Sequence, residues 1–123
     1  MEWSDYITGL SNGDYQMFVQ SADAAYPDPA AMLDSLFKST SPMNYSRYNN
    51  AEVDGALEGA ATETNAAKRT AAYTQIEDRI LRDFPAVPLY YAVNYTLVKP
   101  YVHGLKVTPL GILSLKDVTM DAR

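Results

Sequence analysis

The sequence contains no cysteine, a single histidine and more acidic than basic residues. The absence of cysteine excludes disulfides, thiol catalysis and thiolate metal sites. No apolar run approaches the roughly 20 residues that a membrane-spanning helix needs. Ten Lys and Arg stand against fifteen Asp and Glu, which gives a net charge of −5. A chain without a basic patch is a poor partner for nucleic acid, and its acidity favours solubility.

What the chain does contain is enough apolar material for one modest domain. It has 123 residues, of which 47% are hydrophobic, and this argues against disorder. Ten tyrosines outnumber three phenylalanines and one tryptophan. Tyrosine suits both cores and half-wet clefts, so both uses stay open. No signal peptide is recognisable. If the parent protein is exported, we expect its signal to lie upstream of Met1.

Spacing and capping signals predict four helices. The first ends at Gly13, which is placed for a left-handed cap, and the second begins at Asp28 with a proline in its first position. Asn49, with a glutamate three residues later, is expected to open the third helix, and Asn65 the fourth. The expected buried faces are Trp3, Tyr6, Ile7 and Leu10; Met32, Leu33, Leu36 and Phe37; Val53, Leu57, Ala60 and Ala61; and Tyr73, Ile76, Ile80 and Phe84.

Apolar alternation predicts strands on both sides of this helical region. Residues 14–20 are expected to form one strand, and residues 87–99 a long strand that is apolar on both faces and therefore buried on both. Shorter strands are expected at 104–107 and 112–118, with a turn at 109–111 between them. This order of elements predicts an α/β protein with a small mixed sheet and flanking helices.

Three stretches, taken together, resemble the bacterial extracellular solute-binding proteins of the oligopeptide and dipeptide type (family 5), which serve ABC importers. The resemblance rests on the order and spacing of these stretches, which span nearly the whole chain. They are GDYQM (13–17) with YPDP (26–29); YNNAEVD (48–54) with TN (64–65), KR (68–69), Tyr73 and IE (76–77); and VPLYY (87–91) with VKPYV (98–102) and GL (104–105).

The resemblance implies a type II periplasmic-binding-protein fold, in which two α/β lobes close over a ligand and deliver it to a membrane permease. Residues 1–123 would be a single domain fragment, a portion of the second lobe plus the C-terminal crossing segment. The expected function is solute binding for an ABC importer, with a peptide or small solute as ligand. The remaining lobes and the permease would be partners. The location would be periplasmic or extracellular, either lipid-anchored or soluble.

The loop at residues 21–28 is the expected part of the ligand cleft, and it departs from the family pattern. Peptide-binding members usually carry a tryptophan and an aspartate where this chain has Ala22 and Ala25. The family aspartate receives the α-amino group of the peptide. Asp23 lies two residues earlier, so two readings stay open: Asp23 substitutes through a shifted loop, or the ligand has no ammonium group at that place.

Neighbouring residues of the same loop have competing roles. In open α/β sheets, ligands bind where a strand gives way to a helix, as this loop is expected to do. Tyr26 could line the cleft or pack against the fold. Asp28 is expected mainly as a helix N-cap. The predicted ligand-binding residues are therefore Ala22, Asp23, Ala25 and Tyr26.

No pattern in the sequence supports catalysis. His103 is expected in an exposed or half-buried turn, without a nucleophile or an orienting acid. Asp23 and Asp28 could form a carboxylate pair, but no nucleophile accompanies them. We expect no catalytic residues, no metal site and no cofactor. Two alternatives to solute binding stay open, a stand-alone protein-interaction module and a small hydrolase. Exposed sheet edges are expected to favour a homo-oligomer.

Overall fold

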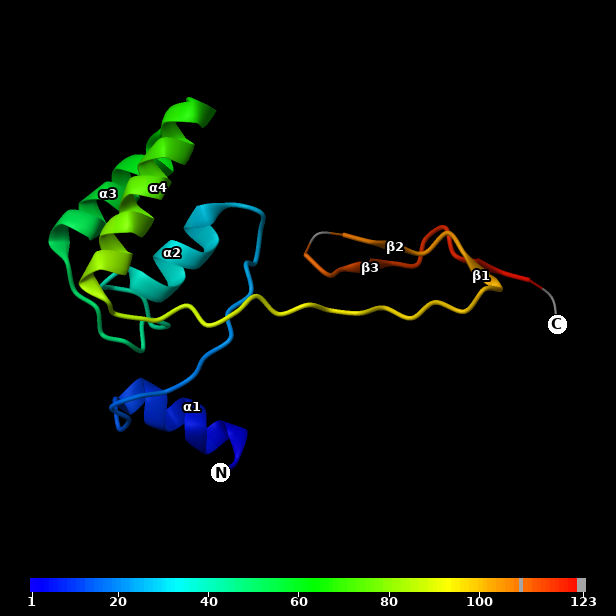
Figure 1. Ribbon diagram of the computed structural model, residues 1–123, viewed down its shortest axis with the longest axis horizontal. Coiled ribbons are helices and arrows are strands. Elements are labelled where there is room, and N and C mark those ends of the chain that lie inside the picture. The colour runs from blue at the N-terminus through cyan, green and yellow to red at the C-terminus, as the bar shows by residue number, and fades with distance from the viewer. Residues whose placement is uncertain (109, 122–123) are drawn as a thin grey trace. The chain divides into compact units, whose positions relative to one another are not determined.

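The computed structural model describes residues 1–108 and 110–121 and divides the chain into two compact units, Met1–Val87 and Pro88–Arg123. The first unit contains the helices α1 (Trp3–Asn12), α2 (Pro29–Phe37), α3 (Ala51–Thr62) and α4 (Ala66–Asp83). The second contains the short strands β1 (Val102–His103), β2 (Lys106–Val107), β3 (Leu113–Ser114) and β4 (Thr119–Met120). The chain is therefore a mixed α/β protein, with its helices and strands in separate units (Figure 1).

The core of the first unit lies between α2, α3 and α4. Helices α3 and α4 pack along each other, and α2 contacts both (Figure 1). Leu57 on α3 is only 1% exposed. Phe37 and Tyr48 are partly buried and pack against this core. Their rings meet edge to face, at a centroid distance of 6.3 Å. The buried cluster comprises Ala30, Val53, Leu57, Ala60, Tyr73, Ile76 and Ile80.

Most of the predicted helix signals are confirmed. Asp28 caps α2, Asn65 caps α4 and Gly13 ends α1 in the left-handed conformation with φ of 77°. One cap was assigned to the wrong residue: Asn50, not Asn49, accepts the backbone N–H groups at the start of α3. Asn50 is the residue directly before the first helical position, and only there does the side-chain oxygen reach the first free N–H groups.

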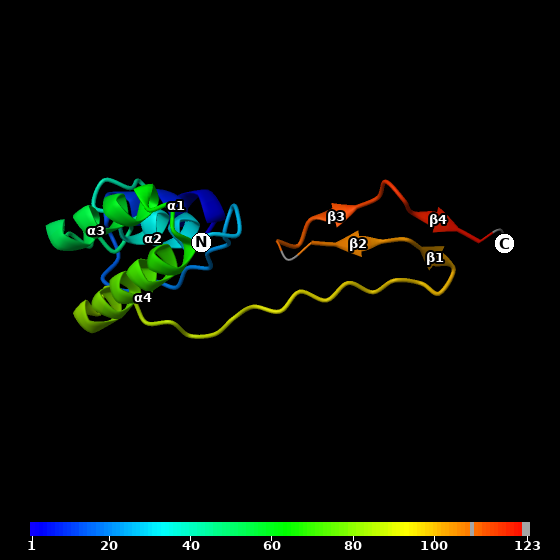
Figure 2. The same cartoon turned by 90° about the horizontal axis from the view of Figure 1, so that it is seen from above.

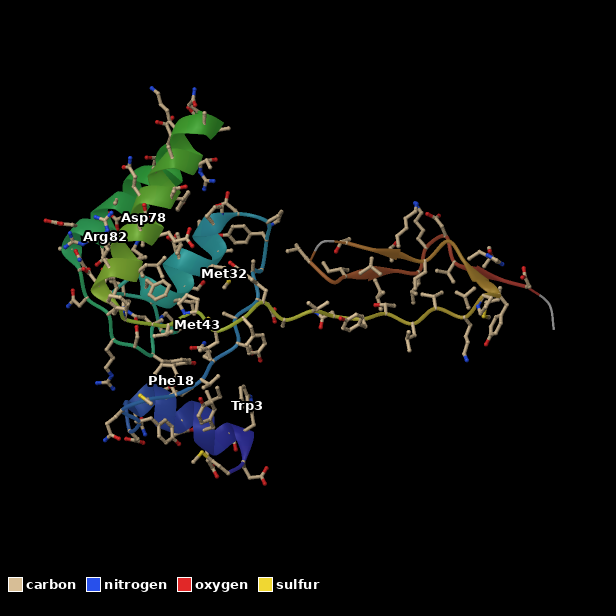
Figure 3. All side chains as sticks on the ribbon, in the orientation of Figure 1. Trp3, Phe18, Met32, Met43, Asp78 and Arg82 are labelled. Carbon is tan, nitrogen blue, oxygen red and sulfur yellow. The ribbon has the colours of Figure 1, made fainter. Side chains whose placement is uncertain are left out.

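The predicted buried faces are right on α3 and α4 except at their ends. Ala61 is exposed, and Phe84 is 77% exposed because it adopts the left-handed conformation that ends α4. In α2, the fully buried residues are Ala30 and Ala31, while the four larger predicted residues are half-buried. On α1, Leu10 is buried but Trp3 (labelled in Figure 3) is exposed.

Two glycines in α3 provide a direct test of helix propensity. A Cβ atom added at Gly55 or Gly59 would meet nothing within 4 Å. Because alanine favours a helix over glycine by about 1 kcal/mol, we expect Gly55→Ala and Gly59→Ala each to raise the free energy of unfolding by about that amount. Urea denaturation followed by circular dichroism measures it. Gly9→Ala is the control and should destabilise, since its Cβ would meet the Tyr15 ring.

The strand predicted at residues 14–20 is wrong. This segment has no strand structure, and Met17 and Val19 on its predicted inner face are exposed. It is held instead by single contacts: the Tyr6 hydroxyl donates to the Val19 carbonyl at 2.8 Å, and the Phe18 ring (Figure 3) meets Tyr45 edge to face. Alternating apolar residues favour an extended backbone, but a strand also needs a hydrogen-bonded neighbour.

The second unit contains one long antiparallel ribbon built from two short ladders. β2 pairs with β3 near the turn, and β1 pairs with β4 further out (Figure 2). Between the ladders, residues 115–118 lie opposite 104 and 105, so the register shifts. Gly104 makes this possible: its φ is 76°, and a Cβ there would collide with the Asp117 carbonyl oxygen.

These ladders correct three sequence predictions. The expected small mixed sheet is instead two antiparallel pairs in the described part of the chain. Strand structure at 104–107 is limited to Lys106–Val107, and at 112–118 to Leu113–Ser114. In the turn expected at 109–111, Gly111 has φ of 75° and its N–H bonds to the Thr108 carbonyl, while residue 109 lies outside the described residues.

The long buried strand predicted at 87–99 is also not seen. Those residues have no strand structure and are largely exposed; Tyr91 is 98% and Leu97 99% exposed. The segment has the apolar alternation of a strand, but among the described residues no neighbouring strand pairs with it. A strand that is apolar on both faces is stable only when both faces are covered.

Candidate functional site

The loop at residues 21–28 connects the irregular segment after α1 to the start of α2. It carries all four predicted ligand-binding residues. Ala22 is half-buried, Asp23 and Ala25 are exposed, and Tyr26 is 50% exposed. The loop does not follow a strand, contrary to expectation, because residues 14–20 form none. Ligand contact by these residues stays a prediction.

Asp28 fixes the end of this loop, and both of its carboxylate oxygens accept hydrogen bonds from within the chain. Its Oδ1 accepts the Ala30 N–H at 2.9 Å, which is the cap of α2, and also the Arg69 Nη2 at 3.0 Å. Its Oδ2 accepts Arg69 Nη1. The hydrogen bond from Arg69, and after it the Ala30 N–H, lowers the pKa of Asp28 below its usual value. The carboxylate is therefore ionised and engaged at neutral pH.

Arg69 is held in turn by Tyr73, one turn further along α4. The Arg69 guanidinium lies 4.9 Å from the centre of the Tyr73 ring, and its Nη2 is 3.3 Å from the Tyr73 hydroxyl. The bond to Asp28 raises the pKa of Arg69 further. Burial raises the pKa of Tyr73, against the opposing charge of Arg69. A buried tyrosine thus supports a bidentate Arg–Asp pair at the base of the loop.

Asp34 adds a second carboxylate on α2. Its Oδ1 is buried and has no hydrogen-bond partner among the described residues. Burial raises the pKa of Asp34, and the charge of Lys38 partly opposes this. An acid with a raised pKa in the folded state binds its proton more readily there than in the unfolded chain. This carboxyl therefore contributes less to stability as the pH rises through its titration range.

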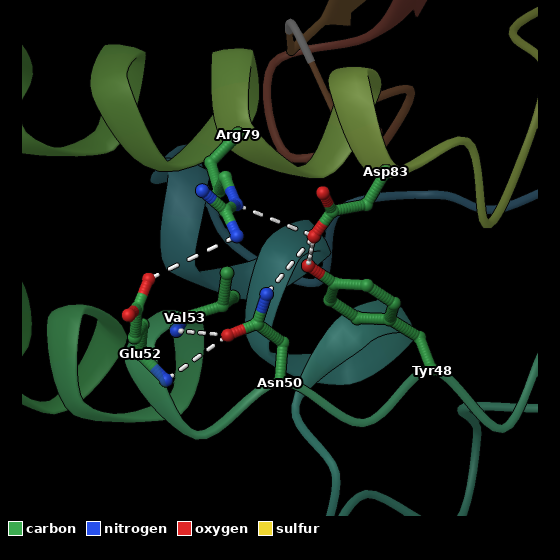
Figure 4. Close-up of polar contacts among 6 residues, drawn as sticks. All are labelled: Tyr48, Asn50, Glu52, Val53, Arg79 and Asp83. Atoms are coloured by element: carbon green, nitrogen blue, oxygen red, sulfur yellow. Dashed lines mark hydrogen bonds and ion pairs between the residues drawn. The ribbon is translucent and has the colours of Figure 1, made fainter.

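A second polar network joins the start of α3 to the end of α4 (Figure 4). The Asp83 Oδ2 accepts the Tyr48 hydroxyl at 2.7 Å and the Asn50 side-chain amide at 2.9 Å. Arg79 reaches Asp83 at 3.4 Å and Glu52 at 3.9 Å. The Tyr48 hydrogen bond is the largest cause of a lowered pKa of Asp83. This network stabilises the helix pair, and its polar side chains bond to one another.

The second unit carries the one histidine. His103 Nε2 lies 3.1 Å from Asp121 Oδ2, and both side chains are more than half exposed. His103 was expected in a turn but lies in β1, and its exposure is as expected. Among residues 1–108 and 110–121, no group of His, Cys, Asp and Glu could hold a metal ion. Within the same residues, no helix is long and apolar enough to cross a membrane.

The sequence indicated where the candidate loop lies but missed its anchor. Arg69 and Tyr73 are four residues apart on α4, and this spacing was a signal that they share one helix face. Their partner Asp28, however, is 41 residues from Arg69. A pairing over that distance follows only from the way α4 packs on α2.

Comparison with known proteins shows which family the chain resembles throughout its length. It is 40% identical, over 85% of its residues, to the probable deoxycholate-binding periplasmic protein YgiS of Escherichia coli. It is 33% identical, over 84% of its residues, to the periplasmic oligopeptide-binding protein OppA of the same organism. The chain belongs to the solute-binding proteins of the oligopeptide and dipeptide type.

Further relatives extend this family to other bacteria. The dipeptide-binding protein DppE of Bacillus subtilis is 26% identical over 94% of the chain. No protein-family model matches the chain. The chain spans only about a fifth of these relatives, namely 19% of YgiS and of OppA and 21% of DppE. Each alignment thus matches the chain to one segment of a longer relative.

Proposed function

We propose that this chain forms part of one wall of the ligand cleft in a solute-binding component of an ABC importer. The single observation that carries the proposal is the 40% identity over 85% of the chain to a protein named as a periplasmic binding protein. On this view, the chain is part of one lobe of a type II periplasmic-binding fold. The remaining lobes complete the cleft, and a membrane permease receives the solute.

The same proposal includes the compartment and the absence of catalysis. Relatives are named as periplasmic and as binding proteins. We therefore place this protein in the periplasm or on the cell exterior, soluble or lipid-anchored, and assign it no enzymatic activity and no cofactor. The engaged Asp28 supports this, because a carboxylate pair with Asp23 for acid–base chemistry would require its oxygens.

The loop at 21–28 favours a ligand without an ammonium group at that place. Ala25 stands where peptide-binding members carry the aspartate for the α-amino group, and Asp28 is occupied by Arg69 and the α2 cap. Burying an ammonium ion without a carboxylate partner is costly. The similarity to a protein named for deoxycholate, an amphipathic acid, supports the same direction. Ala22, Asp23, Ala25 and Tyr26 would contact that ligand.

This ligand class is tested by calorimetric titration with deoxycholate and with trialanine. The protein titrated is the full-length protein, meaning the solute-binding protein with the remaining lobes that complete the proposed cleft. We expect deoxycholate to bind at least about tenfold more tightly than trialanine. Ala25→Asp should strengthen trialanine binding by about tenfold or more, since a hydrogen bond to a charged group contributes about 1.5–3 kcal/mol. Ala24→Asp is the matched control, because it adds the same charge at the neighbouring position, and it should not reproduce the gain.

Asp23→Asn separates the two readings of the loop. If wild-type protein binds trialanine tightly and Asp23→Asn abolishes that binding, Asp23 replaces the missing aspartate and the ligand is a peptide. If wild-type protein binds neither probe and Ala25→Asp changes nothing, the loop is not the site that recognises either class.

A further inference from the structure

We infer that Arg69 and Tyr73 on α4 are positioning residues that hold the ligand loop 21–28 in its binding arrangement. The inference rests on the ligand role proposed for that loop. It concerns residues that do not themselves belong to the loop. They would act on the loop through Asp28.

The first step is the anchoring of Asp28. One carboxylate both caps α2 and accepts two parallel N–H groups from the Arg69 guanidinium. The Asp28 and Arg69 side chains are each only 26% exposed, so water screens this pair less than it would an exposed one. Bidentate geometry fixes direction as well as distance. The end of the loop therefore cannot rotate without breaking both bonds.

The second step is the link from Asp28 back into the loop. The Asp28 N–H donates to the Tyr26 carbonyl at 2.8 Å, which forms a tight turn around the intervening proline. Prolines on both sides of Asp28 restrict the backbone further. Fixing Asp28 therefore fixes the placement of Tyr26.

The third step is the support from the core. Tyr73 is 2% exposed and belongs to the buried cluster between α2, α3 and α4. Its ring and hydroxyl hold the Arg69 guanidinium in place. The half-exposed Tyr26 is thus connected to the rigid core through Asp28, Arg69 and Tyr73. A loop ordered in advance loses less conformational entropy when it binds a ligand.

Hydrogen–deuterium exchange and ligand titration on the full-length protein test this role. Arg69→Lys keeps the charge but cannot form the bidentate pair. Asp28→Asn keeps a good N-cap but removes the charge. For both variants we expect faster amide exchange in residues 22–28, with exchange in α3 unchanged. We also expect deoxycholate binding to weaken about tenfold, roughly the effect of ordering one more residue on binding. Deoxycholate is the probe because of the proposed ligand class.

Arg79→Lys is the matched control. Arg79 is also an arginine of α4 with an acidic partner, but it pairs with Asp83 and Glu52, away from the loop. It should leave both loop exchange and deoxycholate affinity unchanged. The positioning role is overturned if exchange in the loop does not change in Arg69→Lys, or if it rises while the affinity stays at the wild-type value.

The ligand role of the loop and the anchoring role of Arg69 can fail independently of each other. If wild-type protein binds neither deoxycholate nor trialanine, the proposed ligand role of the loop fails, whatever the exchange data show. The exchange measurement then decides alone whether Arg69 anchors the loop: faster exchange in Arg69→Lys supports the anchor, and unchanged exchange overturns it.

Discussion

Leu57→Ala is expected to lower the free energy of unfolding by about 2–5 kcal/mol, the range for a large-to-small substitution in a packed core. Leu57 is 1% exposed and lies in the centre of the cluster between α2, α3 and α4. Truncation leaves a cavity in this cluster, which the surrounding helices close only in part. A loss of this size is a large share of the 5–15 kcal/mol typical of a whole domain.

Urea denaturation of the 123-residue chain, followed by circular dichroism at 222 nm, measures this loss as a lower midpoint with an unchanged slope. Leu115→Ala is the control of the same residue type, at a position that is 69% exposed. It should change the free energy of unfolding by no more than about 0.5 kcal/mol. Equal effects of the two substitutions would contradict the position of the core.

The second large effect is expected in the association of the chain. Taken alone, the 123 residues expose an extended apolar segment, with Leu89, Tyr91, Val93 and Leu97 all mostly accessible. Such a segment offers its backbone and its apolar faces to another strand. We expect the isolated chain to form a dimer or larger oligomer, with a mass by light scattering above the 13.6 kDa of the monomer.

The variant Tyr91→Lys with Leu97→Lys should shift that equilibrium to the monomer, because two lysines on an edge oppose strand pairing. The control places two lysines at exposed positions of the first unit, at Thr64 in the loop before α4 and at Thr70 on α4, so that the net charge changes equally. This control should associate like the wild type. A wild-type chain that stays monomeric at high concentration would show that the segment is not an association surface.

The prediction of the ligand loop illustrates how far the sequence reaches into the site. The sequence singles out residues 21–28 because a strand is expected before them and a helix cap after them, and because the alanines at 22 and 25 break the family pattern. The helix cap is confirmed, whereas the strand is wrong. Nothing in the local sequence indicates that Asp28 is already bound by Arg69. The identity of the cap was predictable, whereas its second partner was not.

The same division applies to the strands. Residues 14–20 and 87–99 both have the alternation or apolar character of strands, yet neither forms one in the described chain. A strand depends on backbone partners that lie elsewhere, so a local pattern shows only that a segment is suited to pairing. In contrast, the pairing of β2 with β3 succeeds because Gly111 and the bond from Gly111 to Thr108 close the turn locally.

The sequence by itself determined the features of this protein that depend on near neighbours. These include the caps at Asp28 and Asn65, the left-handed stop at Gly13, the buried faces of α3 and α4, and the similarity to the solute-binding proteins. Only the tertiary structure decided which distant side chains meet: Asp28 with Arg69, and Tyr48 with Asp83. The physical reason is the distance along the sequence over which each interaction acts. Caps and periodicity act within a few residues of the backbone, whereas a side-chain pair across 35 or 41 residues exists only once the helices have packed.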